Sequence, residues 1–196
     1  TAGTRLARPG CRATPAVFVD GRRIPRMMRT PLDASGLTLG AAVPAAGIFE
    51  NQTIKSRWPG LAEATDLIGS TQVQGRATWC GNLCNASPAA DTIPALIVNQ
   101  AVCLIQGPNG TRRVNVEDFL TGVGKQCLAS DELLVAIEVP KTASRTSDEY
   151  MRFITRTEME FAVTCAAVRV TLDAAGLCSN ARVAICAVAP APLLLQ

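Results

Sequence analysis

Arg76-Ala-Thr-Trp-Cys-Gly-Asn-Leu-Cys-Asn-Ala-Ser-Pro-Ala-Ala-Asp91 is the most informative stretch of this chain. It gathers small residues, hydroxyls and amides into one predicted loop that ends in a carboxylate. Small residues let a ligand approach the backbone, and successive N–H groups can then form a concavity for an anion. Asp91 would accept a hydrogen bond from a ribose or an amine but would repel an adjacent phosphate. A nucleotide diphosphate with its sugar would use all of these groups, although an ordinary polar turn before a helix explains the composition equally well.

The composition is that of a globular protein, and it excludes several kinds of chemistry. The chain has 196 residues, of which 48% are hydrophobic and 18% charged, enough for one sizeable domain or two small ones. Its formal charge of +3 is too small to indicate nucleic-acid binding. Histidine is absent, which excludes a Ser-His-Asp triad, a Cys-His pair and a His-ligated metal.

The eight cysteines favour a reducing, cytoplasmic location. No C-x2-C pair occurs and several cysteines lie in apolar runs, so we expect buried, reduced thiols and no metal site. Cys80 and Cys84 alone are close enough in sequence to suggest a metal-thiolate site, which is the weakest of the interpretations. No run of 18 apolar residues indicates a membrane span. Because the chain stops just after the apolar triplet 193–195, we interpret it as a fragment.

The pattern of strands and helices predicts an α+β fold. Strands are expected over 101–106, 111–115, 133–139, 150–154, 162–172 and 182–188, and helices over 45–52, over 61–68 and from about Asp91. Pro108-Asn109-Gly110 predicts a hairpin turn between the first two strands. Hairpin connections favour α+β over a doubly wound sheet. The polar segment 141–148 is a predicted domain boundary.

Two common nucleotide-binding motifs do not fit. The segment Gly122-Val-Gly-Lys-Gln126 is not a Walker A loop, because that motif needs glycine at Phe119 and Ser or Thr at Gln126. No G-x-G-x-x-G follows a predicted strand, so a Rossmann site is not supported. A nucleotide would therefore be bound on a different scaffold.

Taken together, the motifs resemble the FAD-binding subunit of molybdenum hydroxylases, the xanthine dehydrogenase and carbon monoxide dehydrogenase family. In that family Thr-Ile-Gly-Gly-Asn and then Ala-Asn-Ala-Ser-Pro-Ala-Ala-Asp precede a helix, similar to 76–91 here. Ala2-Gly3-Thr4-Arg5-Leu6 is similar to the first phosphate-binding loop, Ala-Gly-Gly-Thr-Asp-Leu. Further matches follow in order at 37–41, 132–140, 150–156 and 187–190. The resemblance covers essentially the whole chain.

The resemblance implies an incomplete p-cresol methylhydroxylase-type FAD-binding fold followed by a small C-terminal α/β domain. We expect the FAD-binding domain over residues 1–143, with subdomains at about 1–55 and 56–143 and without its N-terminal unit. A truncated C-terminal flavoprotein domain is expected over 144–196.

The same resemblance implies which residues contact the cofactor. Two loops hold the FAD diphosphate through backbone N–H groups, and they match Ala2, Gly3, Thr4, Arg5 and Leu6, and Thr78, Trp79, Cys80, Gly81 and Asn82. Asp91 matches an aspartate on the adenosine side, Ile68 an apolar residue that faces the isoalloxazine, and Leu134 a position near a backbone contact. Arg152 replaces a common lysine, and its charge would stabilise the anionic reduced ring. No catalytic residue is expected, because the cofactor carries the chemistry.

Three positions depart from the family pattern. Cys80 replaces a glycine, Trp79 a small aliphatic residue and Arg5 an acidic residue. If the backbone at position 80 needs φ > 0 or lies against phosphate, a Cβ there costs about 1–3 kcal/mol.

Two functions follow from the resemblance. The first is an oxidoreductase component, the flavin subunit of a molybdopterin-dependent dehydrogenase, with molybdopterin on a large partner subunit and [2Fe–2S] clusters on a small one. Electrons would then reach NAD+ or another acceptor through FAD. The alternative, favoured by the departures, is a decayed relative that no longer binds flavin and serves as a structural or interaction module.

Overall fold

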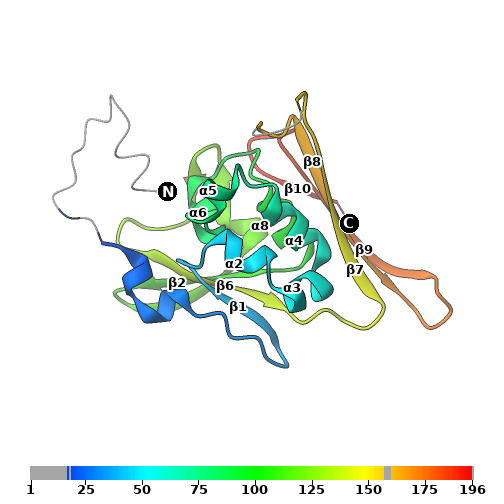
Figure 1. Cartoon of the computed structure of the whole chain (residues 1–196), viewed down its shortest axis with the longest axis horizontal. Helices are drawn as coiled ribbons and strands as arrows, with labels where there is room; N and C mark the ends of the chain where they lie inside the picture. Colours follow the sequence, from blue (N-terminus) through cyan, green and yellow to red (C-terminus); the bar gives the residue numbers. More distant parts are fainter. Residues whose placement is uncertain (1–16, 18, 157–159, 196) are drawn as a thin grey trace.

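Two four-stranded antiparallel sheets enclose a layer of short helices (Figure 1). The structure is a computed structural model, and it describes residues 17, 19–156 and 160–195. The helices lie against the first sheet, and the second sheet flanks them on the right of the view. This mixture of antiparallel sheets and helices confirms the predicted α+β class.

The first sheet has the order β1-β6-β2-β3. It contains β1 (Gly36–Gly40), β2 (Val102–Gly107), β3 (Gly110–Asn115) and β6 (Leu133–Pro140). The hairpin predicted at Pro108-Asn109-Gly110 joins β2 to β3, and Gly110 has a φ of 119°, a conformation that glycine adopts without strain. A smaller two-stranded sheet pairs β4 (Leu120–Gly122) with β5 (Lys125–Gln126).

The second sheet has the order β10-β9-β8-β7. Its strands are β7 (Thr146–Phe153), β8 (Thr164–Leu172), β9 (Cys178–Cys186) and β10 (Leu193–Leu195). Alternate side chains of β7 point into the protein, and β7 begins four residues before the predicted strand. The segment 141–148, predicted as a boundary, is therefore partly strand.

Short helices fill the space between the two sheets. Two 3-10 turns, η1 (Gly21–Arg23) and η2 (Pro25–Met28), precede β1. Between β1 and β2 lie α2 (Ala45–Phe49), α3 (Gln52–Arg57), α4 (Pro59–Asp66), α5 (Thr71–Gln74), α6 (Trp79–Asn85) and α7 (Thr92–Val98), and α8 (Val116–Phe119) follows β3. The predicted helix 45–52 is thus interrupted between α2 and α3, where Asn51 caps α3. The predicted loop 76–91 also contains a helix, α6.

The second sheet packs directly on the helices. α4 contacts β7, and α7 contacts β7, β8 and β9. The approach of α4 to β7 is so close that a Cβ on Gly60 would lie 2.6 Å from the Glu149 carbonyl carbon. One hydrophobic core extends from Leu37 in the first sheet to Cys165 in the second. The division into domains near residue 143 stays a prediction, since this core continues across it.

Two further findings concern the described residues alone. The cysteines among them, Cys80, Cys84, Cys103, Cys127, Cys165, Cys178 and Cys186, are all free thiols. No helix in this part of the chain is both long and apolar enough to cross a bilayer.

Candidate functional site

The motif that begins at Arg76 forms the start of α6. Thr78 is the N-cap, and its Oγ1 accepts a hydrogen bond from the Gly81 N–H at 2.9 Å. The Asn82 N–H donates to the Thr78 carbonyl, also at 2.9 Å. Two of the N–H groups assigned to the diphosphate are therefore already engaged within the helix cap. The N–H groups of Trp79 and Cys80 have no acceptor among the described residues, as expected for the first turn of a helix.

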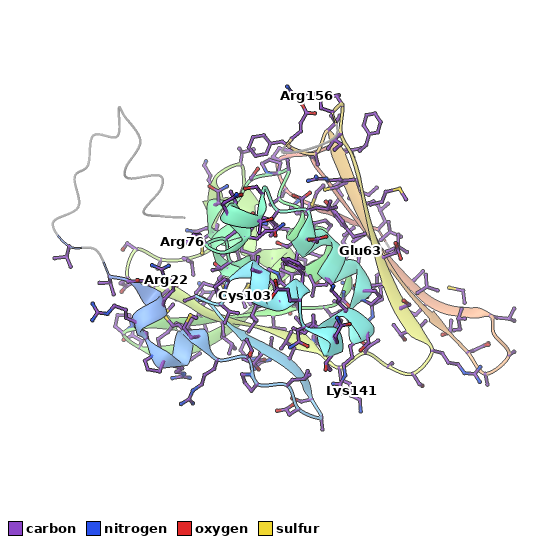
Figure 2. The ribbon with its side chains drawn as sticks, in the orientation of Figure 1. Arg22, Glu63, Arg76, Cys103, Lys141 and Arg156 are labelled. Carbon is purple, nitrogen blue, oxygen red and sulfur yellow. The ribbon has the colours of Figure 1, made fainter. Side chains whose placement is uncertain are left out.

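A cleft of about 650 Å³ opens beside the start of α6. Thr78, Cys80, Gly81 and Cys84 form one wall, and Leu134 of β6 lies in the opposite sheet. Two arginines, Arg22 and Arg76, also line the cleft, and Figure 2 shows them on the same side of the molecule. Arg22 forms an ion pair with Asp20, with Nη2 2.9 Å from Oδ2, so the cleft combines apolar residues with the positive charge of Arg76. This combination suits an elongated ligand that carries an anionic group.

The two unusual residues of the motif leave this cleft open. Trp79 is fully buried, and its Nε1 donates to the Thr65 Oγ1 of α4 at 2.9 Å, so its ring belongs to the core. Cys80 is 3% exposed and lies in the first turn of right-handed helix, without the positive φ that would favour glycine. The strain considered for a Cβ at this position is therefore absent.

A second cavity, of about 250 Å³, is lined by other residues of α6, Asn82 and Asn85. Its walls include Ile68, Asn82, Asp91 and Arg152, four of the residues predicted to contact the cofactor. The Asn82 side chain also donates to Thr92 Oγ1 at 2.8 Å, which fixes α6 against the start of α7. The two cavities are thus lined by different residues of one short helix.

A buried ion pair forms the polar end of the smaller cavity. Arg152 Nη1 lies 3.5 Å from Asp91 Oδ1, and the two side chains are only 10% and 14% exposed. The Tyr150 hydroxyl donates to the same Asp91 oxygen at 2.7 Å. Arg152 also donates to the Leu67 carbonyl at the end of α4, at 3.0 Å, where a cation is favoured.

Burial dominates the electrostatics of this pair. It raises the pKa of Asp91 above its ordinary value, and the Tyr150 hydrogen bond and the Arg152 charge offset only part of that effect. Burial, together with the neighbouring Asp91 charge, also raises the pKa of Tyr150, so its hydroxyl stays a donor. The cavity thus presents a carboxyl group whose charged form is disfavoured by burial.

The comparisons with known proteins identify the family of this chain. Residues 9–142, more than half of the chain, match a family described as the FAD binding domain in molybdopterin dehydrogenase. The chain belongs to this family.

Several members of the family are similar over most of this chain. It is 30% identical over 181 residues to the carbon monoxide dehydrogenase medium chain of Hydrogenophaga pseudoflava, covering 92% of this chain and 62% of that protein. It is 29% identical to a xanthine dehydrogenase FAD-binding subunit of Escherichia coli O157:H7, covering 85% of this chain and 57% of the relative. The chain therefore spans about six-tenths of the length of these relatives.

Solved structures extend the likeness to the fold. A chain of the H. pseudoflava carbon monoxide dehydrogenase that lacks the Mo-pyranopterin moiety superposes with a TM-score of 0.82 at 30% identity, covering 88% of this chain and 59% of that one. A chain of a Cu,Mo carbon monoxide dehydrogenase gives 0.86 at 27% identity, covering 97% and 64%. A chain of quinoline 2-oxidoreductase from Pseudomonas putida 86 gives 0.82 at 26% identity, covering 98% and 64%. These matches confirm the p-cresol methylhydroxylase-type fold expected from the sequence.

Most of the predicted FAD contacts that the structure describes line one of the two cavities. Thr78, Cys80, Gly81 and Leu134 line the larger cleft, whereas Ile68, Asn82, Asp91 and Arg152 line the smaller cavity. Trp79 contributes only its backbone, because its side chain is in the core. The remaining predicted contacts, Ala2, Gly3, Thr4, Arg5 and Leu6, lie outside the described residues.

Two of the predicted cofactor contacts meet in one cavity. The sequence assigned Asp91 to the adenosine side and Arg152 to the flavin ring, and the two side chains form an ion pair in the smaller cavity. Both roles stay predictions.

The sequence did not lead us to Tyr150, whose hydroxyl donates to Asp91 of the Asp91–Arg152 ion pair. The signal was present, because inward-facing residues alternate along β7 and place Asp148, Tyr150 and Arg152 on one face. The predicted strand began only at Tyr150, which concealed this alternation.

The metal-thiolate interpretation finds no support at Cys80 and Cys84. Within the described part of the chain, no group of three or more Cys, Asp or Glu side chains is placed to hold a metal. Burial raises the pKa of the Cys84 thiol to about 11 and that of Cys80 well above its usual range. Without a metal, both thiols are therefore protonated at neutral pH.

Proposed function

We propose that this chain binds FAD across α6, with the diphosphate at the start of the helix. The ADP part would occupy the larger cleft, and the isoalloxazine ring would occupy the cavity lined by Ile68, Asp91 and Arg152. The observation that carries the proposal is that two cavities are lined by different residues of the one helix that bears the family motif. Asp91 is then assigned to the flavin end and not to the adenosine end.

Each part of the site has a distinct physical task. The Trp79 and Cys80 N–H groups and the Arg22 and Arg76 side chains supply donors and positive charge for the diphosphate. Ile68 supplies an apolar contact for the ring, and the Asp91–Arg152 pair supplies an acceptor and a cation. When bound, FAD accepts and passes on electrons, and the protein positions it and adjusts its electrostatic environment.

The retained cleft argues for flavin binding over a decayed module. Trp79 would have abolished the site had its ring entered the cleft, but it packs against Thr65 instead. Cys80 adds a thiol to the wall without a strained backbone. Two of the three departures from the family pattern are thus accommodated, and the third, Arg5, lies outside the described residues.

Purified protein should quench FAD fluorescence on titration, and removing the positive charge beside the motif should weaken the binding. Arg76→Glu is expected to lower FAD affinity about tenfold or more, because a carboxylate would face the diphosphate. Lys141→Glu makes the same change of charge at an exposed position away from both cavities and should leave affinity unchanged. A wild-type protein that neither retains nor binds FAD would contradict the proposal and support the decayed module.

We further propose that the whole protein is the flavin subunit of a molybdopterin-dependent dehydrogenase. A large subunit would carry molybdopterin, a small one [2Fe–2S] clusters, and FAD would deliver electrons to NAD+ or another acceptor. The names of the relatives support this assignment, since one is a medium chain and another an FAD-binding subunit. Co-expression with the polypeptides encoded beside it tests the idea, because a true subunit should co-purify with an iron–sulfur chain and a molybdopterin chain. Purification of the protein alone from such cells would contradict it.

A further inference from the structure

Tyr150 connects the second sheet to the proposed flavin cavity. It is 5% exposed on the inward face of β7, and its hydroxyl donates to Asp91 Oδ1 at 2.7 Å. Arg152, two residues further along the same face, approaches the same oxygen at 3.5 Å. Two side chains of one strand therefore hold one carboxylate oxygen of the loop before α7.

The contacts restrict how Asp91 can move. Arg152 is fixed independently, because it donates to the Leu67 carbonyl at the end of α4. The hydrogen bond from Tyr150 and the nearest approach of Arg152 both fall on Asp91 Oδ1. Oδ2 is consequently the oxygen that remains available to a ligand in the cavity that Asp91 lines.

On the assumption that the proposed FAD site is correct, we propose that Tyr150 is a positioning residue that fixes Asp91 as the acceptor for an N–H donor of the isoalloxazine ring. The hydroxyl orients the carboxylate through Oδ1 and leaves Oδ2 for the ring, while Arg152 balances the charge. Without this hydroxyl, Asp91 keeps only the longer contact to Arg152, and its orientation toward the cavity is no longer determined.

The charged and titratable surroundings of Asp91 are few. Tyr150 and Arg152 on β7 contact it directly, Cys165 on β8 and Cys186 on β9 lie behind Tyr150, and Glu160 lines the same cavity. Tyr150 donates its only hydroxyl proton to Asp91, which stabilises the charged form of the carboxyl. Loss of that donor should therefore be measurable at Asp91 itself, even before FAD is added.

Tyr150→Phe in the whole chain tests the proposal, because it keeps the ring and removes only the hydroxyl. Carbon-13 NMR of the Asp91 carboxyl, assigned by its absence in Asp91→Asn, should show a pKa about one pH unit higher in the variant than in wild type. FAD affinity should fall about tenfold, the scale of a lost hydrogen bond to a charged group. Met151→Leu, which changes the outward neighbour on the same strand, should alter neither measurement.

A second experiment uses the fact that Tyr150 is the only tyrosine in the chain. Uniform incorporation of 3-fluorotyrosine then changes this residue alone, into a stronger donor of nearly the same shape. It should lower the Asp91 pKa below the wild-type value and preserve FAD binding, and it remains available should Tyr150→Phe fail to fold.

The outcomes separate this inference from the proposed function. An Asp91 pKa that is identical in wild type, Tyr150→Phe and fluorotyrosine protein would overturn the positioning role, as would wild-type FAD affinity in Tyr150→Phe. If wild type binds no FAD, the proposed function fails and the ligand part of this inference fails with it. In that case a shifted Asp91 pKa in the variants would show only that Tyr150 controls the carboxylate.

Discussion

Asp91 and Asp148 are two buried carboxylates that join the same two helices to the second sheet, at opposite ends. Asp148 Oδ2 accepts from the Leu61 N–H at the start of α4, at 3.1 Å, and from Asn99 Nδ2 at the end of α7, at 2.8 Å. Asp91 precedes α7, and its partner Arg152 reaches the end of α4. Burial raises the pKa of both carboxyls.

The two carboxylates differ in whether they face a cavity that could hold a ligand. Asp148 is 4% exposed, lines neither of the two cavities beside α6, and faces Arg169 across the sheet register. Asp91 lines a cavity and takes both its contacts on one oxygen. The same residue type in nearly the same setting therefore closes the fold at one end of α4 and α7 and stays available for a ligand at the other.

Removing each carboxylate should separate the two roles, with the largest effect at Asp148. Asp148→Ala is expected to lower the free energy of unfolding by about 3 kcal/mol, because it leaves Arg169 without its charge partner and the Leu61 and Asn99 donors unpaired. Asp91→Ala should cost about half as much, since its partners lie beside an open cavity, but should weaken FAD binding. Urea denaturation and FAD titration of both variants provide the measurement. Equal losses of stability would contradict the distinction.

The end of α4 that Asp148 holds also depends on the close approach of the α4 backbone to β7. Gly60→Ala is expected to cost about 2 kcal/mol, because the new Cβ would lie 2.6 Å from the Glu149 backbone and would push α4 off β7. Gly47→Ala in α2 is the matched control, since nothing lies within 4 Å of its Cβ position. It should be neutral or stabilising by up to about 1 kcal/mol through helix propensity. A neutral Gly60→Ala would show that the α4–β7 contact is loose.

The sequence predicted the elements whose signals are local. The hairpin at Pro108-Asn109-Gly110 followed from turn chemistry, and the helix from about Asp91 followed from the apolar residues after it. α6 was missed, because the segment 79–85 contains residues with weak helix propensity. Thr78, a good N-cap followed by apolar residues at Trp79 and Leu83, was the available signal.

The site was only partly predictable, since its decisive contacts join distant segments. The family resemblance identified Asp91 and Arg152, but no local pattern indicates that residues 61 positions apart form one ion pair. The core placement of Trp79 depends on Thr65 of α4 and is likewise tertiary. Sequence therefore named residues that line the two cavities, while their division between these cavities required the fold.

Neutralising Arg152 and neutralising Asp91 should shift the midpoint potential of bound FAD in opposite directions. Arg152→Gln is expected to lower the FAD midpoint potential by about 30 mV, equivalent to ~1.4 kcal/mol for two electrons, because a cation near the ring favours the anionic reduced state. Asp91→Asn removes the opposing charge and should raise the potential by a similar amount. Arg145→Gln, at the far end of the second sheet, makes the same charge change and should leave the potential unaltered. Shifts of the same sign in Arg152→Gln and Asp91→Asn would show that neither charge acts on the flavin directly.

The smallest expected effect is a difference in pH dependence between the two carboxylates. Because the folded-state pKa of each is raised, the folded protein binds more protons than the unfolded chain above the ordinary value of 3.8. The stability that each contributes is thus fully present below pH 3.8 and is lost as the pH rises through the raised pKa. Glu132 acts in the opposite sense, since hydrogen bonds from Arg112 lower its pKa to about 2, so only differences between variant and wild type are informative.

The pH dependence linked to Asp91 should respond to FAD, and that linked to Asp148 should not. An N–H donor on the bound ring favours the Asp91 carboxylate, so FAD affinity is expected to rise, by less than tenfold, as the pH increases through the Asp91 pKa. Asp91→Asn should bind FAD with no such dependence, whereas Asp148→Asn should retain it. Because Asp148 has its partners within the protein, saturating FAD should leave its pH-linked loss of stability unchanged. Flavin fluorescence titrations between pH 4 and pH 8 measure the first effect, and urea denaturation with and without FAD measures the second. A pH dependence that survives in Asp91→Asn would place the titrating group elsewhere and remove the distinction between a carboxylate that binds a ligand and one that only joins helices to a sheet.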